Sequence, residues 1–275
     1  MIETDKFEEV TQIKMSREIN GKPVYWVSAY LVDGLLIDTG CSYTADELIE
    51  FLDDKKVDLA VNTHFHEDHT GANKVLMDKL GIDIFAHPDS VKRISEKIEL
   101  YPYQETVWGY PEPTVVKPVP DEIKTDNYTF QVIETPGHSI GHIALVELSK
   151  GWCFSGDIFA REMPKFIRPE EDVREMIKSM RSLISLPCER LVLLTSVGKI
   201  VEDGRESLSA CIDNLSELAA RVNALEKNGF GIGQIMDEVF GGEHNFSAIT
   251  NNQYSTYNFV KSLLKCDNYN ISFPR

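Results

Sequence analysis

Cysteine is scarce in this chain and shows no pairing pattern. The 275 residues include 5 cysteines, none of them in a CxxC pair: Cys41, Cys153, Cys188, Cys211 and Cys266. A disulfide-stabilised secreted domain usually carries an even set at close spacing. We therefore expect reduced thiols in a cytoplasmic protein.

Long hydrophobic runs are also missing. The first ten residues, MIETDKFEEV, contain no basic segment followed by an apolar run, which argues against a secretory signal peptide. The apolar stretches are of strand length, far below the about 20 residues that span a bilayer. We expect no membrane partner.

Positive charge is in deficit as well. With 28 basic and 44 acidic side chains, the formal net charge is −16. A field of this sign repels polyphosphate backbones, and no basic patch stands out, so we regard nucleic acid as an unlikely partner. We expect a small-molecule substrate instead.

Alternating strand and helix patterns predict an α/β domain over residues 1–205. A hairpin is expected around Asp33-Gly34, between the apolar runs 24–29 and 31–37. A helix is expected from Asp68 or Thr70 to Leu80, with Gly81 as its stop. Apolar periodicity predicts further helices at 44–52 and 173–184, and strands at 57–61, 130–134, 142–148, 151–155 and 190–194.

Strand signals vanish in residues 206–275, where the spacing predicts a helical C-terminal appendage. Its apolar stripes are expected to be core and subunit contacts, which leaves a homodimer open. Proline and aromatic residues interrupt the periodicity over 88–125. Two interpretations stand for that segment: a lid over the substrate or a packed surface loop.

Three of the 7 histidines fall within the stretch VNTHFHEDHTG, residues 61–71. On extended backbone, alternate side chains point the same way, so His64 and His66 can reach one metal ion. Asp68 and His69 follow a turn and can face a second ion. Imidazole and carboxylate ligands suit zinc and comparable transition metals, including iron and manganese.

Two later segments add ligands after predicted strands. In TPGHS, residues 135–139, a Pro-Gly turn presents His138. In FSGD, residues 154–157, Asp157 follows a glycine at the strand end. Either segment alone could be an ordinary turn or helix cap, but with the histidine cluster they supply a third imidazole and a carboxylate able to bridge two ions.

The motifs THFHEDHTG, TPGHS and FSGD, in this order, resemble those of the metallo-β-lactamase superfamily. The resemblance covers roughly residues 20–200 and includes the loop IDTG at 37–40, which in the family lies under the metals. It implies an αββα sandwich with the metals at one edge. His64, His66 and His138 would hold the first ion, Asp68 and His69 the second, and Asp157 would bridge them.

The helical end, with the pattern GFGIGQIMDEVFG, resembles the winged-helix-like end of hydrolases of the glyoxalase II and β-lactamase-like-protein-2 type. One position departs from the family pattern. Val197 stands where a second histidine usually serves the second ion, and valine has no ligand atom. We expect one or two zinc ions, with the second held more weakly.

The remaining candidates are expected to have supporting roles. His142 is predicted to donate or accept a hydrogen bond next to the ligands, and His87 to be structural or at the pocket rim. Cys41, after the IDTG loop, is expected to be a buried, unreactive thiol. His244 could replace the missing histidine, although a surface histidine is the commoner case.

The leading hypothesis is metal-dependent hydrolysis of an ester, thioester, lactone or amide, with Asp68 orienting the water and passing its proton to the leaving group. A second hypothesis is a mononuclear Fe(II) enzyme similar to persulfide dioxygenases, using His64, His138 and Asp157. A third is a degenerate, non-catalytic metal-binding protein, which only Val197 supports. RNA cleavage is disfavoured by the charge of −16.

Overall fold

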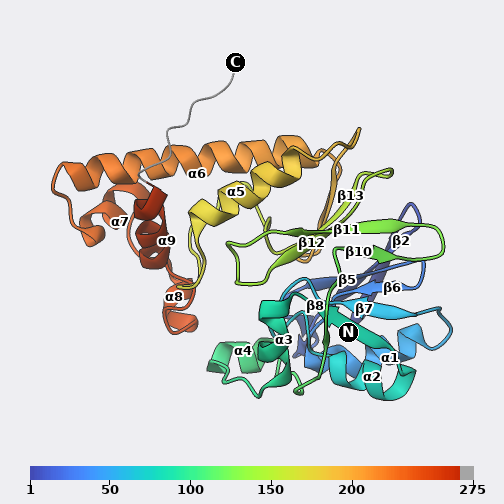
Figure 1. The fold of residues 1–275 in the computed structure, drawn as a ribbon. Helices are drawn as coiled ribbons and strands as arrows, with labels where there is room; N and C mark the ends of the chain where they lie inside the picture. Colours follow the sequence, from blue (N-terminus) through green and yellow to red (C-terminus); the bar gives the residue numbers. More distant parts are fainter. Residues whose placement is uncertain (267–275) are drawn as a thin grey trace.

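Strands that are buried at every position need cover on both faces. In β12 (Ile143–Glu147), Leu145 packs into one apolar cluster and Val146 into another, because successive side chains point to opposite faces. The computed structural model describes residues 1–266 and places two such sheets face to face, with helices outside each (Figure 1). The predicted αββα sandwich is confirmed.

The first sheet is antiparallel at its N-terminal edge and parallel from β6 onward. Its strand order is β1 (Ile2–Phe7), β2 (Val10–Met15), β5 (Val27–Val32), β6 (Leu35–Ile37), β7 (Leu59–Val61), β8 (Asp83–Ala86) and β9 (Lys117–Pro118). The predicted hairpin joins β5 to β6 through Asp33 and Gly34, whose φ values of 48° and 83° match a two-residue turn. A separate small ribbon pairs β3 (Glu18–Ile19) with β4 (Lys22–Pro23).

The second sheet is antiparallel except for the parallel pair β13 and β14. Its strand order is β10 (Glu122–Lys124), β11 (Thr129–Glu134), β12, β13 (Trp152–Gly156), β14 (Val192–Thr195) and β15 (Ile200–Val201). Tyr30 and Val61 from the first sheet share a buried cluster with Phe154 from the second. This cluster is the core between the sheets.

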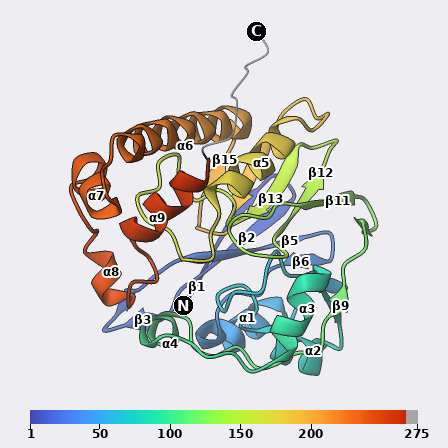
Figure 2. The same cartoon turned by 60° about the vertical axis from the view of Figure 1, so that its left-hand side comes forward.

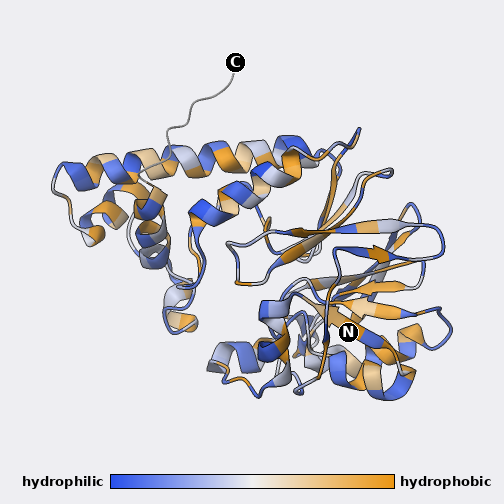
Figure 3. Ribbon diagram, in the orientation of Figure 1, coloured by the Kyte–Doolittle hydropathy of each residue, from blue (hydrophilic) through white to orange (hydrophobic). Residues whose placement is uncertain are grey.

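Helices cover the outer face of the first sheet. They are α1 (Ala45–Leu52), α2 (Asn73–Leu80) and α3 (Pro88–Ser95), while the 3-10 helix η1 (Ser42–Thr44) and α4 (Pro102–Val107) lie in the adjoining loops. Leu48 of α1 and Leu76 of α2 pack with Ala60 of β7. Figure 3 shows hydrophobic residues concentrated on the strands and hydrophilic residues spread along the helices.

The second sheet is covered by α5 and by the C-terminal helices, as Figure 2 shows from another side. They are α5 (Val173–Ile184), α6 (Gly204–Lys227), α7 (Ile232–Phe240), α8 (Phe246–Ile249), α9 (Thr256–Leu263) and the 3-10 helix η2 (Leu264–Cys266). Leu193 of β14, Leu215 of α6 and Val260 of α9 belong to one buried cluster. The division into 1–205 and 206–275 stays a prediction, and the described core is continuous across it.

Several boundaries differ from the sequence predictions. β5 runs from Val27 to Val32, so Leu31 belongs to the first strand of the hairpin, and β1 and β2 were not predicted at all. α2 begins at Asn73 rather than at Asp68 or Thr70. The cause is tertiary: the Gly71 amide donates to the Gly40 carbonyl at 2.8 Å, which holds the preceding residues in a loop. Within residues 1–266, no helix has both the length and the apolar character to cross a bilayer.

Candidate metal centre

The loops that follow β7, β11 and β13 meet at one edge of the sandwich. These loops carry the six side chains predicted as metal ligands: His64, His66, Asp68, His69, His138 and Asp157. The structure brings them together as two neighbouring groups. Five of the six are buried, and Asp157 is half-buried.

The first group consists of His64, His66 and His138. His64 Nε2 lies 2.9 Å from His66 Nδ1, and His138 Nε2 lies 3.0 Å from the same atom. Three ring nitrogens therefore converge on one point from two different sheets.

Neighbouring groups set the orientation of these rings. Thr63 Oγ1 donates its only proton to Asp38 Oδ2 at 2.8 Å and lies 3.0 Å from His64 Nδ1, so it accepts the Nδ1–H of His64. Glu171 Oε1 lies 3.5 Å from His138 Nδ1 and favours a proton there. The Nε2 lone pairs of both rings then face inward, as metal ligation requires.

The second group joins His69 to two carboxylates. His69 Nε2 lies 3.7 Å from Asp68 Oδ2 and 3.7 Å from Asp157 Oδ1. The other oxygen of Asp157 lies 3.6 Å from His138 Nε2 in the first group. The Asp157 carboxylate therefore stands between the two groups, and its role as a bridge between two ions stays a prediction.

Asp38 holds His69 of the second group in its orientation. Its carboxylate accepts hydrogen bonds from the Thr63 amide at 2.7 Å and from His69 Nδ1 at 2.8 Å. Its φ of 60° is rare for a residue with a side chain, and such strain is common at functional sites. The sequence placed the IDTG loop under the metals; it did not predict that Asp38 would orient His69.

The residues fit a bound cation. His69 Nε2 and Asp157 Oδ1 are buried and have no hydrogen-bond partner in the described part of the chain. Folded proteins rarely leave buried polar atoms unpaired. In the first group, the Nε2 lone pairs of His64 and His138 both face His66 Nδ1, which carries at most one proton and can donate to only one of them. One cation, in contrast, can accept the lone pairs of all three nitrogens.

Without a cation, the charges within the site are mixed: neighbouring carboxylates raise the pKa of His69 and of His138 against the effect of burial. Burial, reinforced by His69, holds the pKa of His64 well below its usual range, and burial with Arg168 does the same for the pKa of His66. Both rings are therefore neutral, the form that binds metal. Burial raises the pKa of Asp68 to about 6. Burial opposes the charge of Asp157 too, but His69 and His138 outweigh it and lower the pKa of that carboxyl.

His142 supports the ligand from β13, which confirms the predicted hydrogen bond next to the site. Its Nε2 accepts the Asp157 amide proton at 3.1 Å, and its Nδ1 lies 2.8 Å from Thr135 Oγ1. Gly156 has a φ of 52°, and a Cβ there would lie 2.6 Å from His142 Nε2. Only glycine allows the backbone to approach the imidazole this closely.

A buried ion pair behind the metal loop was not predicted from the sequence. Arg168 Nη2 lies 3.5 Å from Glu67 Oε1, and Gln104 Nε2 donates to the same oxygen at 2.8 Å. Arg168 Nε also donates to the Tyr254 hydroxyl at 2.8 Å. This network connects the metal loop with α4 and with the segment before α9.

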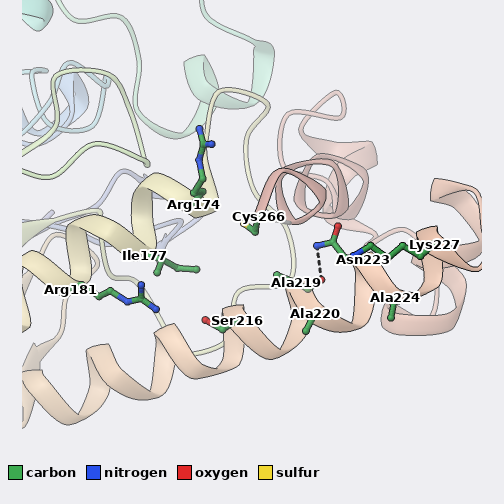
Figure 4. Close-up of a pocket in the computed structure, with 10 residues that line it drawn as sticks. All are labelled: Arg174, Ile177, Arg181, Ser216, Ala219, Ala220, Asn223, Ala224, Lys227 and Cys266. Atoms are coloured by element: carbon green, nitrogen blue, oxygen red, sulfur yellow. Dashed lines mark hydrogen bonds between the residues drawn. The ribbon is translucent and has the colours of Figure 1, made fainter. Parts of the chain in front are cut away.

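A cavity of about 440 Å³ opens beside His138 and Asp157. The segment 88–125 contributes Tyr103, Val107 and Trp108 to its wall, and a lid motion of that segment stays a prediction. Val197, in the turn after β14, lines the same cavity. A second cavity, of about 330 Å³, lies between α5 and α6 and, among the described residues, is lined by none of the histidines (Figure 4).

The other candidates from the sequence do not join the two groups. His244 also lines the larger cavity, but it is exposed, stacks 4.6 Å from the Phe166 ring and belongs to neither group in the described chain. Cys41 is buried beside Tyr103 and Trp108, and burial raises the pKa of its thiol. His87 accepts the Asp89 amide at the start of α3.

Comparisons with known proteins agree with this architecture. The family model described as the metallo-beta-lactamase superfamily matches residues 26–195. The hydroxyacylglutathione hydrolase GloC of Haemophilus influenzae is 27% identical over 185 residues, which are 63% of this chain and 84% of that protein. The probable metallo-hydrolase MJ0888 of Methanocaldococcus jannaschii is 29% identical over 174 residues, 60% of this chain and 84% of that protein.

Solved structures share the fold at lower identity. A beta-lactamase domain protein from Burkholderia ambifaria is 16% identical with a TM-score of 0.72, covering 96% of this chain and 88% of its own. The similarity therefore extends through the C-terminal helices. The protein TTHA1623, solved in a di-iron-bound form, is 23% identical with a TM-score of 0.54, covering 74% of this chain and 96% of its own.

Proposed function

The chain belongs to the metallo-β-lactamase superfamily, and on this basis we propose that it is a metal-dependent hydrolase of an ester, thioester, lactone or amide of a small molecule. The observation that carries the proposal is the Asp157 carboxylate, whose two oxygens face His138 and His69 at 3.6 and 3.7 Å. Two groups of ligands joined in this way suit a hydrolytic centre. The named function of GloC, a hydrolase, supports the same reaction class.

We propose zinc as the metal, with iron or manganese as alternatives. His64, His66 and His138 would hold the first ion, and Asp68, His69 and Asp157 the second. Nitrogen and oxygen ligands suit zinc. The similar protein TTHA1623 was solved in a di-iron-bound form, which supports iron as an alternative. A zinc ion here supplies Lewis-acid chemistry, polarising a substrate carbonyl and making water more acidic.

The protein's own residues perform the remaining work in this proposal. Asp68, buried beside His69, takes the proton of the attacking water on the oxygen that does not face His69 and gives it to the leaving group. Asp38 holds His69 in orientation through its 2.8 Å hydrogen bond. The aromatic wall of the adjoining cavity excludes water from the substrate.

The first test is Asp68→Asn in protein purified without added metal. We expect turnover on a panel of esters, thioesters and lactones to fall at least about 100-fold, because a positioned proton carrier is lost. Metal analysis should still find the ion of the first group, whose ligands are untouched. Unchanged turnover would remove Asp68 from its proposed role.

The second candidate, a mononuclear Fe(II) enzyme similar to persulfide dioxygenases, is favoured by Val197, which leaves the second group one imidazole short. Iron in the purified protein together with oxygen uptake on a persulfide would support it. Bound metal without turnover of any panel member would instead favour a non-catalytic protein. We also propose a cytoplasmic location, which the five free thiols support.

A further inference from the structure

The cavity beside the metal centre is lined by a continuous series of aromatic rings. The rings of Tyr25 and Trp108 lie 5.7 Å apart, and Trp108 and Tyr103 follow at 6.1 Å. Tyr103 continues to Tyr254 at 6.2 Å. Tyr254 then contacts Phe166 at 6.1 Å and Phe246 at 5.7 Å. We call these six cavity residues the aromatic arc.

The inner part of the arc is held rigidly. Arg168 lies under it, with its guanidinium carbon 5.0 Å from the Tyr254 ring centre and 6.0 Å from that of Trp108. Its ion pair with Glu67 ties the same guanidinium to the metal loop. The position of this wall is therefore fixed relative to the metal ligands.

The outer part of the arc exposes apolar surface to solvent. Tyr25 is 44% exposed and Phe246 is 37% exposed, although both lie at the cavity. Exposed aromatic side chains that gather around a concave site typically mark ligand binding. Val197 extends the same apolar surface toward Asp157, where a histidine would have offered a polar atom.

We propose that the aromatic arc is an acyl pocket, and that the protein hydrolyses thioesters or esters whose acyl group is a bulky, apolar ring system. This inference rests on the proposed function. In the reaction, the water oxygen bonds to the acyl carbon, the carbon–sulfur or carbon–oxygen bond breaks, and the leaving thiolate or alkoxide takes up a proton. The volume of about 440 Å³ lies within the range of cavities that enclose a small organic ligand.

A matched substrate series tests the proposal. The probes are N-acetylcysteamine thioesters of acetic, hexanoic, cyclohexylacetic and phenylacetic acid, in which the carbonyl carries an unbranched carbon throughout. We expect kcat/KM for the two ring-bearing substrates to exceed that for acetyl by about 10–100-fold, because the ring is buried in the arc. Equal values, or a preference for acetyl or for a hydroxyacyl glutathione thioester, would overturn the acyl pocket.

Variants of the two phenylalanines that contact Tyr254 locate the preference. Phe166→Ala and Phe246→Ala should each lower the ratio of phenylacetyl to acetyl kcat/KM by at least about fivefold, since each removes apolar contact. Tyr257→Ala is the matched control, because Tyr257 is 46% exposed on α9 and does not line the cavity. Circular dichroism and metal content check that each variant is folded. A ratio unchanged in both arc variants counts against the proposal.

A binding measurement separates this inference from the proposed function. Calorimetry with the metal-loaded protein should give a Kd for phenylacetate at least about tenfold below that for acetate, whether or not thioesters are turned over. Hydrolysis of the whole series without preference would leave the hydrolase standing and reject the acyl pocket. Preferential binding without any hydrolysis would reject the hydrolase and retain the pocket. Equal binding of the two acids rejects the pocket in either case.

Discussion

Single residues decide how many ions this site can hold. The first group has three imidazoles that converge within hydrogen-bond distance, whereas in the second His69 faces the carboxylates of Asp68 and Asp157 at 3.7 Å. Val197 lines the cavity next to that second group and contributes only methyl groups. We therefore expect the second position to bind an ion more weakly than the first.

For Val197→His, we expect two ions per chain where the parent protein retains one. An added imidazole would give the second group a fourth protein ligand and tighten binding by at least about tenfold. Metal analysis after purification without added metal measures the stoichiometry. His244→Ala serves as the control and should leave the metal content unchanged, because His244 lies outside both groups. Two tightly held ions in the parent protein would contradict this account.

At the scale of elements, turns place the ligands by packing against helices. The turn that carries His138 lies against the start of α5, where the Asp172 amide donates to the Gly137 carbonyl at 2.8 Å. Gly137 has a φ of 130°, and a Cβ there would lie 2.4 Å from the Met176 amide nitrogen. No side chain fits between this turn and the helix.

Gly137→Ala is expected to destabilise the protein by at least about 2 kcal/mol, because it adds both backbone strain and overlap with helix backbone. Urea unfolding followed by circular dichroism measures the change. Gly233→Ala is the control: a Cβ there meets nothing within 4 Å, and alanine favours helix. That variant should be neutral or more stable by up to about 1 kcal/mol. A Gly137→Ala protein as stable as the parent would disprove the tight packing of the turn.

Local sequence patterns predicted those elements whose turn residues, apolar spacing or helix stop lie within the element itself. The Asp33-Gly34 turn, the amphipathic helix α5 and the stop of α2 at Gly81, with φ of 67°, all appear in the structure. The start of α2 could not be predicted, because contacts of Gly71 with the loop at Gly40 override local helix preference. β1 escaped prediction because its central residues, ETDK, are polar or charged and exposed, and only Ile2 and Phe7 at its ends are apolar and partly buried.

In the metal site too, features set by local sequence were predicted and features set by tertiary contacts were not. The spacing of the histidines predicted a metal cluster, because all six predicted ligands lie in three short sequence motifs. Arg168 and Glu67 are 101 residues apart, and Glu171 has no motif that links it to His138. Such pairs form only when the chain folds, so no local pattern reveals them.

At the scale of the whole molecule, the C-terminal helices complete the sandwich. α6 and α9 share a buried cluster with β14 and α5, and their removal would expose Leu193 and Met180. Tyr254 and Phe246 from the same region line the cavity beside the metal centre. Stability and the shape of the cavity therefore both depend on helices that are distant in sequence from the metal motifs.

A chain that ends at Asp203 is expected to be insoluble or to bind a hydrophobic dye strongly, because the outer face of the second sheet loses part of its cover. Soluble yield and dye fluorescence, compared with the full chain, measure the effect. A control that ends at Cys266 retains every described helix and should remain folded. A cooperative unfolding transition in the shorter chain would instead support two independent domains, 1–205 and 206–275.

The position of the ligands on both sheets has a mechanical consequence. His64 and His66 follow a strand of the first sheet, whereas His138 and Asp157 follow strands of the second. A cation shared among them is a cross-link between the halves of the sandwich, so its binding energy adds to the free energy of unfolding. A bound ion would then hold the two sheets together, and its loss would weaken the contact between them.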